Sequence, residues 1–474
     1  MKSVFLAIAA LVAGQMSCAA APIWNCGGGK KPEATSACAD PEIVRLDKAI
    51  DARIARLAAS TDPVTALLLK RDQRWFQDAL MIGNASDVEL KDDSERQSMK
   101  DRLQARLKTL ESMQPKADGL PGHWANALLT AKVTKAAGEA LQIEIEGKVN
   151  YDDIDETMEC GLKAELKPEG DGWFRGTPVR PDGKPSEESK EETKDKSDVL
   201  RLRMQAGTLR IVLIESERSD VCNGPSFVGG TYFATSAAPS SGKVQTVAPT
   251  FDCGTAKNED EEEICADPEL AQKDVEIAKL YRDTLKRLDS KNAGYLREDQ
   301  RGWAVIKNDS FSFNLHPYSD KRYSHVHHTS GARADLLESQ NGRIEMLRGL
   351  DEARKGFVGR WIGYNAGVTI APKKDATDGT LAVSGGKWDA NDYKAHCELD
   401  TEGKASGNAL KTDDDSPRFA RDGMTLTVDA HYPDKPRTKD MELKMKRPDY
   451  CSRLDTAKAR LFPVKDGAKV KEGR

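Results

Sequence analysis

The cysteines give the clearest chemical prediction, the formation of disulfide bonds, because their spacing occurs twice in the chain. Eleven residues separate Cys26 from Cys38, and eleven separate Cys253 from Cys265. When Cys18 in the N-terminal segment is set aside, an even number of cysteines remains, which in an exported chain predicts disulfide bonds. The eight cysteines are Cys26, Cys38, Cys160, Cys222, Cys253, Cys265, Cys397 and Cys451.

An internal repeat suggests how these cysteines pair. The segment CADPE occurs at 38–42 and again at 265–269, and from there the two halves align without a gap for about fifty residues. Later anchors, such as Arg106 with Arg343, keep the same order, so we interpret the chain as a tandem duplication. The simplest pairing for two equivalent copies is Cys26–Cys38, Cys160–Cys222, Cys253–Cys265 and Cys397–Cys451.

The two short loops closed by these bonds are candidate binding elements. Lys30 and Lys257 each lie four residues after the first cysteine of a loop. A loop tied at both ends loses little entropy on binding, so either lysine can be inserted into a partner's cleft; the alternative is a solvated surface charge. The acidic run 259–263 is interpreted as a solvated segment, with contact to a basic partner as the alternative.

Four histidines gather in the segment 316–328, and His-x-His-His is able to ligate zinc or copper. No cysteine or acidic ligand is spaced with them, so a surface loop is favoured and no cofactor is predicted. The sequence has no nucleophile elbow, phosphate loop, paired-acid pattern or HExxH motif. We therefore expect no enzyme activity and name no catalytic residue.

The first twenty residues have the order of a secretory signal peptide. Lys2 precedes a short apolar run and then small residues, with cleavage expected after Ala19. Cys18 raises the alternative of a lipoprotein, so the predicted location is periplasmic or secreted. No later stretch is long and apolar enough for a membrane helix. A net charge of −5 with 31% charged residues argues against nucleic-acid binding and permits attraction to a cationic partner.

Each copy begins with helices. Asp40 and Asp267 precede proline and are expected to cap helices with strong apolar faces. A buried carboxylate needs a partner, so two structural salt bridges between neighbouring helices are predicted: Asp47 with Arg74, and Asp274 with Arg301.

The rest of each copy alternates polar and apolar residues in short stretches, as antiparallel strands do. Six to eight such strands per copy predict a barrel or a sandwich, and Gly-x-Trp at 122–124 and 359–361 resembles the opening of lipocalin-like barrels. The predicted fold class is α+β. The expected segments are a signal peptide at 1–20, helical domains at 22–115 and 251–352, β domains at 119–235 and 355–464, and a linker at 236–250.

The helical segments resemble the N-terminal domain of the LprI-like lysozyme inhibitors. The resemblance rests on Cys-x11-Cys-Ala-Asp-Pro-Glu, an apolar helix with an aspartate, and a Gln-Arg pair near an aromatic residue, over about 60 residues per copy. It implies an exported protein that inhibits lysozyme or another cell-wall hydrolase. Two other hypotheses stay open: a carrier that holds a small ligand in its β domains, and an envelope immunity or scaffold protein with another protein partner.

Overall fold

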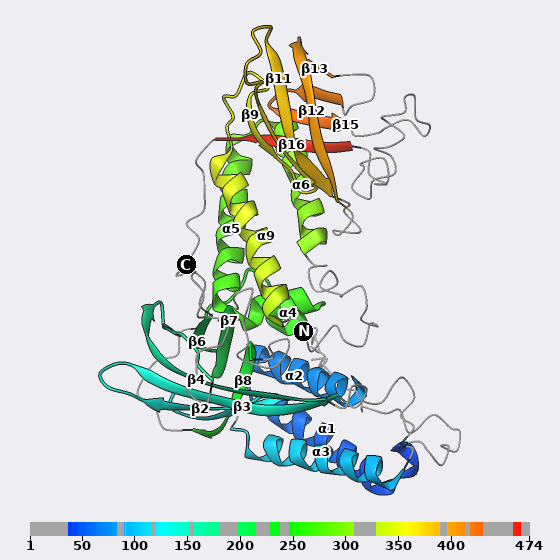
Figure 1. The fold of residues 1–474 in the computed structure, drawn as a ribbon, viewed down its shortest axis with the longest axis vertical. Helices are drawn as coiled ribbons and strands as arrows, with labels where there is room; N and C mark the ends of the chain where they lie inside the picture. Colours follow the sequence, from blue (N-terminus) through cyan, green and yellow to red (C-terminus); the bar gives the residue numbers. More distant parts are fainter. Residues whose placement is uncertain are drawn as a thin grey trace, which may run out of the picture.

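The computed structural model describes residues 37–82, 90, 92–114, 119–151, 156–180, 198–214, 228–237, 246–307, 329–388, 396–412, 418–429 and 458–465. The molecule is elongated, with one β barrel at the top and the other in the lower half (Figure 1). The paired helices α5 (Pro268–Arg287) and α9 (Thr329–Gly349) run between them. The signal peptide segment and the histidine segment 316–328 lie outside the described residues.

The first half begins with a helical layer. After the short η1 (Ala37–Ala39) come α1 (Pro41–Ala59), α2 (Pro63–Ile82) and α3 (Asp93–Ser112). Asp40 caps α1 as its sequence predicts, since its side chain accepts hydrogen bonds from the backbone amides of Glu42 and Ile43 at 2.9 and 3.3 Å. The apolar stripe of α1 packs into a core shared with α2 and α3.

The chain then forms a closed antiparallel barrel in which each strand pairs with the next and the last pairs with the first. Its strands are β1 (Gly122–Ala125), β2 (Leu129–Lys135), β3 (Leu141–Tyr151), β4 (Glu156–Gly170), β5 (Trp173–Gly176), β6 (Val199–Gln205), β7 (Thr208–Ile214) and β8 (Gly230–Ala237). Alternate side chains fill its interior, including Leu129, Ile143 and Leu202.

The second half repeats this order. Its helical elements are η4 (Cys253–Thr255), α4 (Glu259–Ala266), α5, α6 (Ser290–Lys307) and α9, and its barrel strands are β9 (Gly359–Ile362), β10 (Ala366–Pro372), β11 (Thr380–Trp388), β12 (His396–Ser406), β13 (Ala409–Thr412), β14 (Arg418–Asp422), β15 (Thr425–Asp429) and β16 (Lys458–Val464). The predicted α+β class is confirmed. The sequence left a barrel or a sandwich open for the β domains, and each forms a closed barrel.

Matching contacts hold equivalent elements together in the two halves. The indole nitrogen of Trp124 donates to the carbonyl of Leu120 at 2.9 Å, and that of Trp361 donates to the carbonyl of Phe357 at 2.6 Å. Each tryptophan is buried at the start of its barrel. The two Gly-x-Trp segments therefore make equivalent contacts in the two halves.

A buried arginine also recurs in both halves and joins helices to barrel. Arg106 on α3 donates to Asp72 at 2.8 Å and to Gln73 at 3.1 Å on α2. The second carboxylate oxygen of Asp72 accepts the backbone amide of Ala127, between β1 and β2, at 2.7 Å. The equivalent contacts in the second half join Arg343 to Asp299 and Gln300, and Asp299 to the amide of Tyr364.

Candidate protein-binding site

The clamped loop of the second half is the predicted binding element that the structure describes. A disulfide joins Cys253 and Cys265, which confirms that predicted pair. Cys38 and Cys160 are also disulfide-bonded, and their expected partners, Cys26 and Cys222, lie outside the described residues. So do Lys30, Cys451 and the side chain of Cys397.

Local hydrogen bonds make this loop rigid. The side chain of Asn258 caps α4 by accepting the amide of Glu261 at 2.9 Å, and the Glu261 carboxylate accepts the amide of Lys257 at 2.7 Å. This reciprocal pattern satisfies two backbone donors at the helix start. Lys257 itself is exposed. The loop thus presents one lysine to solvent from a fixed backbone.

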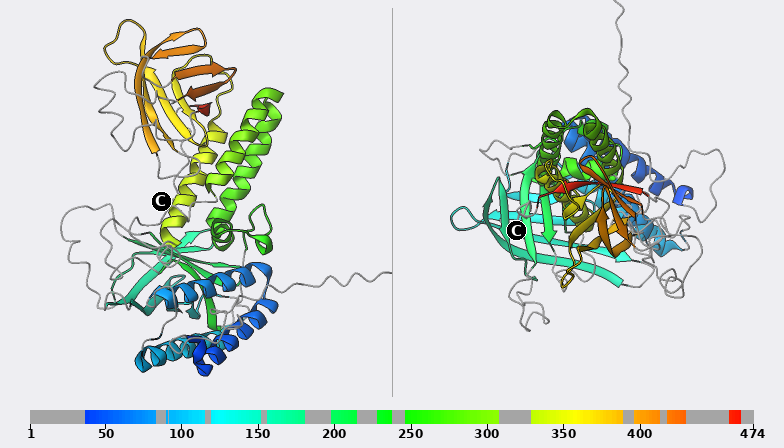
Figure 2. Two further views of the ribbon diagram at one scale, coloured as in Figure 1. Left: turned by 90° about the vertical axis from the view of Figure 1, so that its right-hand side faces the viewer. Right: turned by 90° about the horizontal axis from the view of Figure 1, so that it is seen from above.

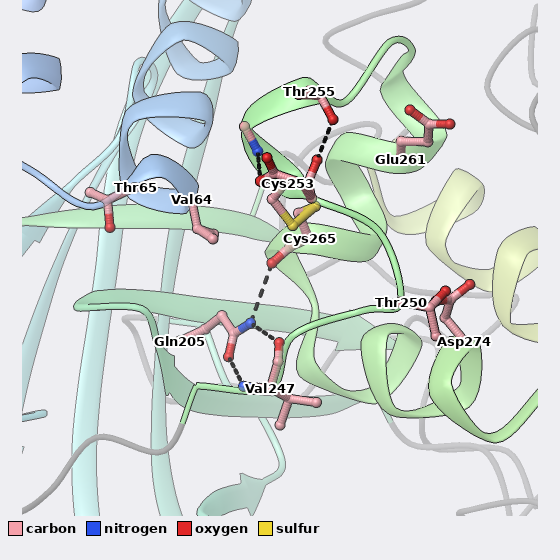
Figure 3. The surroundings of a disulfide bond; sticks show 12 residues. Val64, Thr65, Gln205, Val247, Thr250, Cys253, Thr255, Glu261, Cys265 and Asp274 are labelled. Carbon is pink, nitrogen blue, oxygen red and sulfur yellow. Dashed lines mark hydrogen bonds between the residues drawn. A yellow bond between two sulfur atoms is a disulfide. The ribbon is translucent and has the colours of Figure 1, made fainter. Parts of the chain in front are cut away.

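The other side of the loop is attached to the first barrel. The side-chain amide of Gln205, at the end of β6, donates to the carbonyls of Val247 at 3.0 Å and Cys265 at 3.3 Å (Figure 3). Val247 returns a hydrogen bond from its amide to the Gln205 oxygen. Val247 belongs to the segment predicted as a linker, and the described end of that segment, 246–250, is bound to the barrel at this residue.

The interpretation of residues 259–263 as a solvated run is wrong. All five lie in α4, and Asp260, Glu262 and Glu263 are 1%, 7% and 0% exposed. Instead, Glu262 and Glu263 contact arginines of the first half of the same chain. Burial of carboxylates is tolerated here since arginines lie against them.

The arginines that meet α4 come from α2 and from the outer face of β7. The Glu263 carboxylate pairs with Arg71 at 2.6 Å and with Arg210, and all three side chains are almost fully buried. Glu262 pairs with Arg74. Arg210 faces outward from the barrel, yet it is buried because the helices of the second half cover this strand.

The start of α5 extends the same network. Asp267, the N-cap of α5, lies 3.2 Å from Arg210 and 2.7 Å from Arg333 of α9. Glu269 lies 2.6 Å from Arg333 and 3.1 Å from Arg201 of β6. We call this set the arginine joint; it comprises Arg71, Arg74, Arg201, Arg210 and Arg333 with Glu262, Glu263, Asp267 and Glu269.

The joint fixes the charge state of Asp267. Burial alone raises the pKa of this carboxyl, but the neighbouring guanidinium groups of Arg333 and Arg210 outweigh that effect. The pKa of Asp267 therefore lies well below its usual range, and the pKa of Arg333 is raised by the same contacts against the effect of its burial. Both groups stay ionised at neutral pH.

The first predicted salt bridge is replaced by a contact of the joint. Asp47 is buried on α1 and lies one turn before Asp51, but Arg74 donates to Glu262 on α4. The predicted pairing of Arg74 with Asp47 is therefore wrong. The reason is that docking of the second half brings an acidic helix to α2, which no pattern inside one copy shows.

The second predicted salt bridge is also replaced. The Asp274 carboxylate accepts the amide and hydroxyl of Thr250 at 2.8 and 2.6 Å, which fastens the segment before η4 to α5. Arg301 is exposed on α6 and donates to the carbonyl of Arg297 at 3.3 Å. Asp274 thus faces the segment before η4, while Arg301 points to solvent.

Sequence reasoning missed the two arginine systems that organise the molecule. The Asp72–Arg106 contact was present among the aligned anchors, where both residues keep their type in the second copy. The joint had a weaker signal: Arg201 and Arg210 alternate with apolar residues along their strands, as outward-facing residues of a barrel do. Burial of the outer face of a barrel strand follows only from how the two halves dock.

Within the described residues, no group of three or more His, Cys, Asp and Glu side chains is placed to hold a metal ion. In the same part of the chain, none of the helices combines the length and apolar character needed to cross a bilayer. Searches found no matching family model, no matching curated protein and no matching solved structure for this chain.

Proposed function

We propose that this protein is an exported binder of a cell-wall hydrolase, with lysozyme the first target, and that it acts by occluding the active-site cleft. The proposal starts from the resemblance of the helical segments to LprI-like lysozyme inhibitors. The observation that carries it is the rigid clamped loop, closed by the Cys253–Cys265 disulfide, from which Lys257 is exposed.

The chemistry of the target supports this choice. Glycoside hydrolases of the lysozyme type cleave with a pair of carboxyl groups in a cleft, and an inserted ammonium group complements them. Because the backbone of the loop is already fixed on both sides of Lys257, binding costs little further conformational entropy. The net charge of −5 favours the approach of a cationic enzyme.

Glu262 and Glu263 of the acidic run do not contribute to that attraction as a surface, since arginines of the joint pair with them. Among the charged side chains between Cys253 and Cys265, Lys257 is the exposed one. Because the chain is interpreted as a duplication, Lys30 is proposed as the equivalent residue of the first copy. Binding through one loop would give one hydrolase per chain, and binding through both would give two.

A residual-activity assay tests the proposal directly. Purified protein in excess is mixed with lysozymes of several types, and hydrolysis of cell walls is followed; we expect inhibition of at least one type. Lys257→Ala is expected to weaken inhibition, whereas Lys279→Ala, a change at an exposed lysine on α5, leaves it unchanged. Absence of inhibition across all lysozyme types would reject the proposal.

The two other hypotheses gain less support. A small-ligand carrier needs an internal cavity, and the described interior of the first barrel is packed with apolar side chains. The tandem, elongated architecture also suits an envelope scaffold or immunity protein with another partner. Capture of envelope proteins on immobilised chain, followed by identification of the bound species, separates that role from hydrolase binding.

A further inference from the structure

A groove lies on the outside of the first barrel, where the end of α3 passes over strands β1, β2 and β3. Its volume is about 360 Å³, which is at the lower end of the range for small-molecule sites. Charged residues of both signs line it: Lys108 from α3, His123 from β1, Lys132 from β2, and Glu144 and Glu146 from β3. It is separate from the clamped loop and from the arginine joint.

Strand register orders these charges across the groove floor. His123 is opposite Lys132, and Lys132 is opposite Glu144, so the three side chains form one row on the outer face. Glu146 lies two residues further along β3, opposite Thr130, on the same face. The acidic side chains of the groove therefore lie on β3, while His123 and Lys132 lie on the neighbouring strands β1 and β2.

Within the described part of the chain, the five ionisable side chains of the groove differ in whether they are paired. Glu144 pairs with Lys163 at 2.9 Å. By contrast, the side chains of Lys108, His123 and Glu146 make no hydrogen bond or ion pair in the part of the chain that the structure describes. Unpaired groups of opposite charge, set at the two ends of a cavity, complement a ligand that carries both charges.

The second half provides an internal comparison. The positions equivalent to Lys108 and His123 are Glu345 and Arg360, which form an ion pair with each other. The partner of Gly367 in register, equivalent to Glu146, is Gly386. In the second half these positions satisfy their own charges and lack the acidic end, so the arrangement of unpaired charges is a property of the first half.

We propose that this groove binds a short zwitterionic peptide, with its carboxylate toward Lys108 and His123 and its ammonium group toward Glu146. His123 and Glu146 are separated by two strand spacings and two residues along the strand, about 12 Å between backbones. An extended tripeptide spans about 10 Å, which is close to that separation. Charge and length thus select a peptide of about three residues with free termini.

Titration calorimetry with trialanine tests the proposal on the full-length protein. We expect saturable binding with a dissociation constant near or below about 1 mM. N-acetyl-trialanine amide, which lacks both terminal charges, is expected to bind at least about tenfold more weakly, because each charged contact is lost. Equal binding of the two peptides, or no binding of trialanine at millimolar concentration, would overturn the proposal.

Variants locate the site. Glu146→Gln and Lys108→Met are each expected to weaken trialanine binding by about tenfold. Their controls are Glu165→Gln and Lys135→Met, which change exposed charges elsewhere on the same barrel and leave affinity unchanged. Circular dichroism spectra that match the unaltered protein show that folding is kept. If the control variants weaken binding as much as the groove variants, the peptide binds elsewhere and the proposal fails.

Discussion

Arg210 of the first barrel lies against Asp267, the residue that caps the first long helix of the second half, with the guanidinium Nε 3.2 Å from the carboxylate. A strand side chain of one half thus contributes to the helix start of the other. Ala266, next to the cap, joins the apolar core of α1, α2 and α3. The halves are therefore coupled through both charge and apolar burial.

Removal of one acid from the arginine joint is expected to be costly. Glu263→Ala leaves Arg71 and Arg210 buried without their shared carboxylate, and breaking a buried ion pair in this way lowers stability by about 3–5 kcal/mol. Urea unfolding measures the loss. Glu338→Ala, at an exposed position on α9, is the control and is expected to change the free energy of unfolding by less than about 0.5 kcal/mol. Equal stability of the two variants would show that the joint contributes nothing.

Asp51 predicts a pH dependence of opposite sign to that of a salt-bridged acid. Burial, and then the neighbouring Asp47, raise the pKa of Asp51 to about 6. A raised pKa in the folded state means that its protonated form stabilises the fold below the unfolded value of 3.8, and this stabilisation is lost as the pH rises through about 6.

Asp51→Asn is therefore expected to raise the melting temperature at pH 7 and to have little effect at pH 4. Differential scanning calorimetry at the two pH values checks it. A melting temperature lowered at pH 7 would mean that the carboxylate is stabilised by contacts stronger than its burial.

The Cys253–Cys265 bond is expected to hold α4 against the first half. Replacing both cysteines by serine opens a loop of sequence separation 12, and the loop-entropy relation gives a loss of about 3 kcal/mol. Limited proteolysis checks the local effect, since cleavage between 253 and 266 should become faster than cleavage elsewhere. Unchanged cleavage would indicate that the arginine joint alone keeps α4 in place.

Much of the fold followed from local signals. Asp40 and Asp267 cap helices as predicted, because an aspartate before proline has few other roles at such a position. Strand alternation marked the barrel segments, although it left barrel and sandwich open. The pairing of the first strand with the last decides between them, and that contact is distant in sequence.

The joint was not predicted because its partners belong to different copies. From the acidic run onward, Asp260, Glu263 and Asp267 recur at the spacing of one helical face, a pattern that favours a buried stripe. Carboxylates at such positions are normally assigned to solvent, and only the docked arginines of α2 and β7 make their burial favourable. The signal for the joint is complementary charge between the two copies, which neither copy shows alone.

The surface that receives α4 also differs between the two halves. At the positions equivalent to Arg71 and Arg210, the second half carries Glu298 and Thr427. A third unit, or the start of another molecule, would find a negative and a neutral side chain where two cations are needed. Docking through the joint is therefore heterologous: the first half receives α4, and these two positions of the second half do not supply the cations that would receive another copy of it.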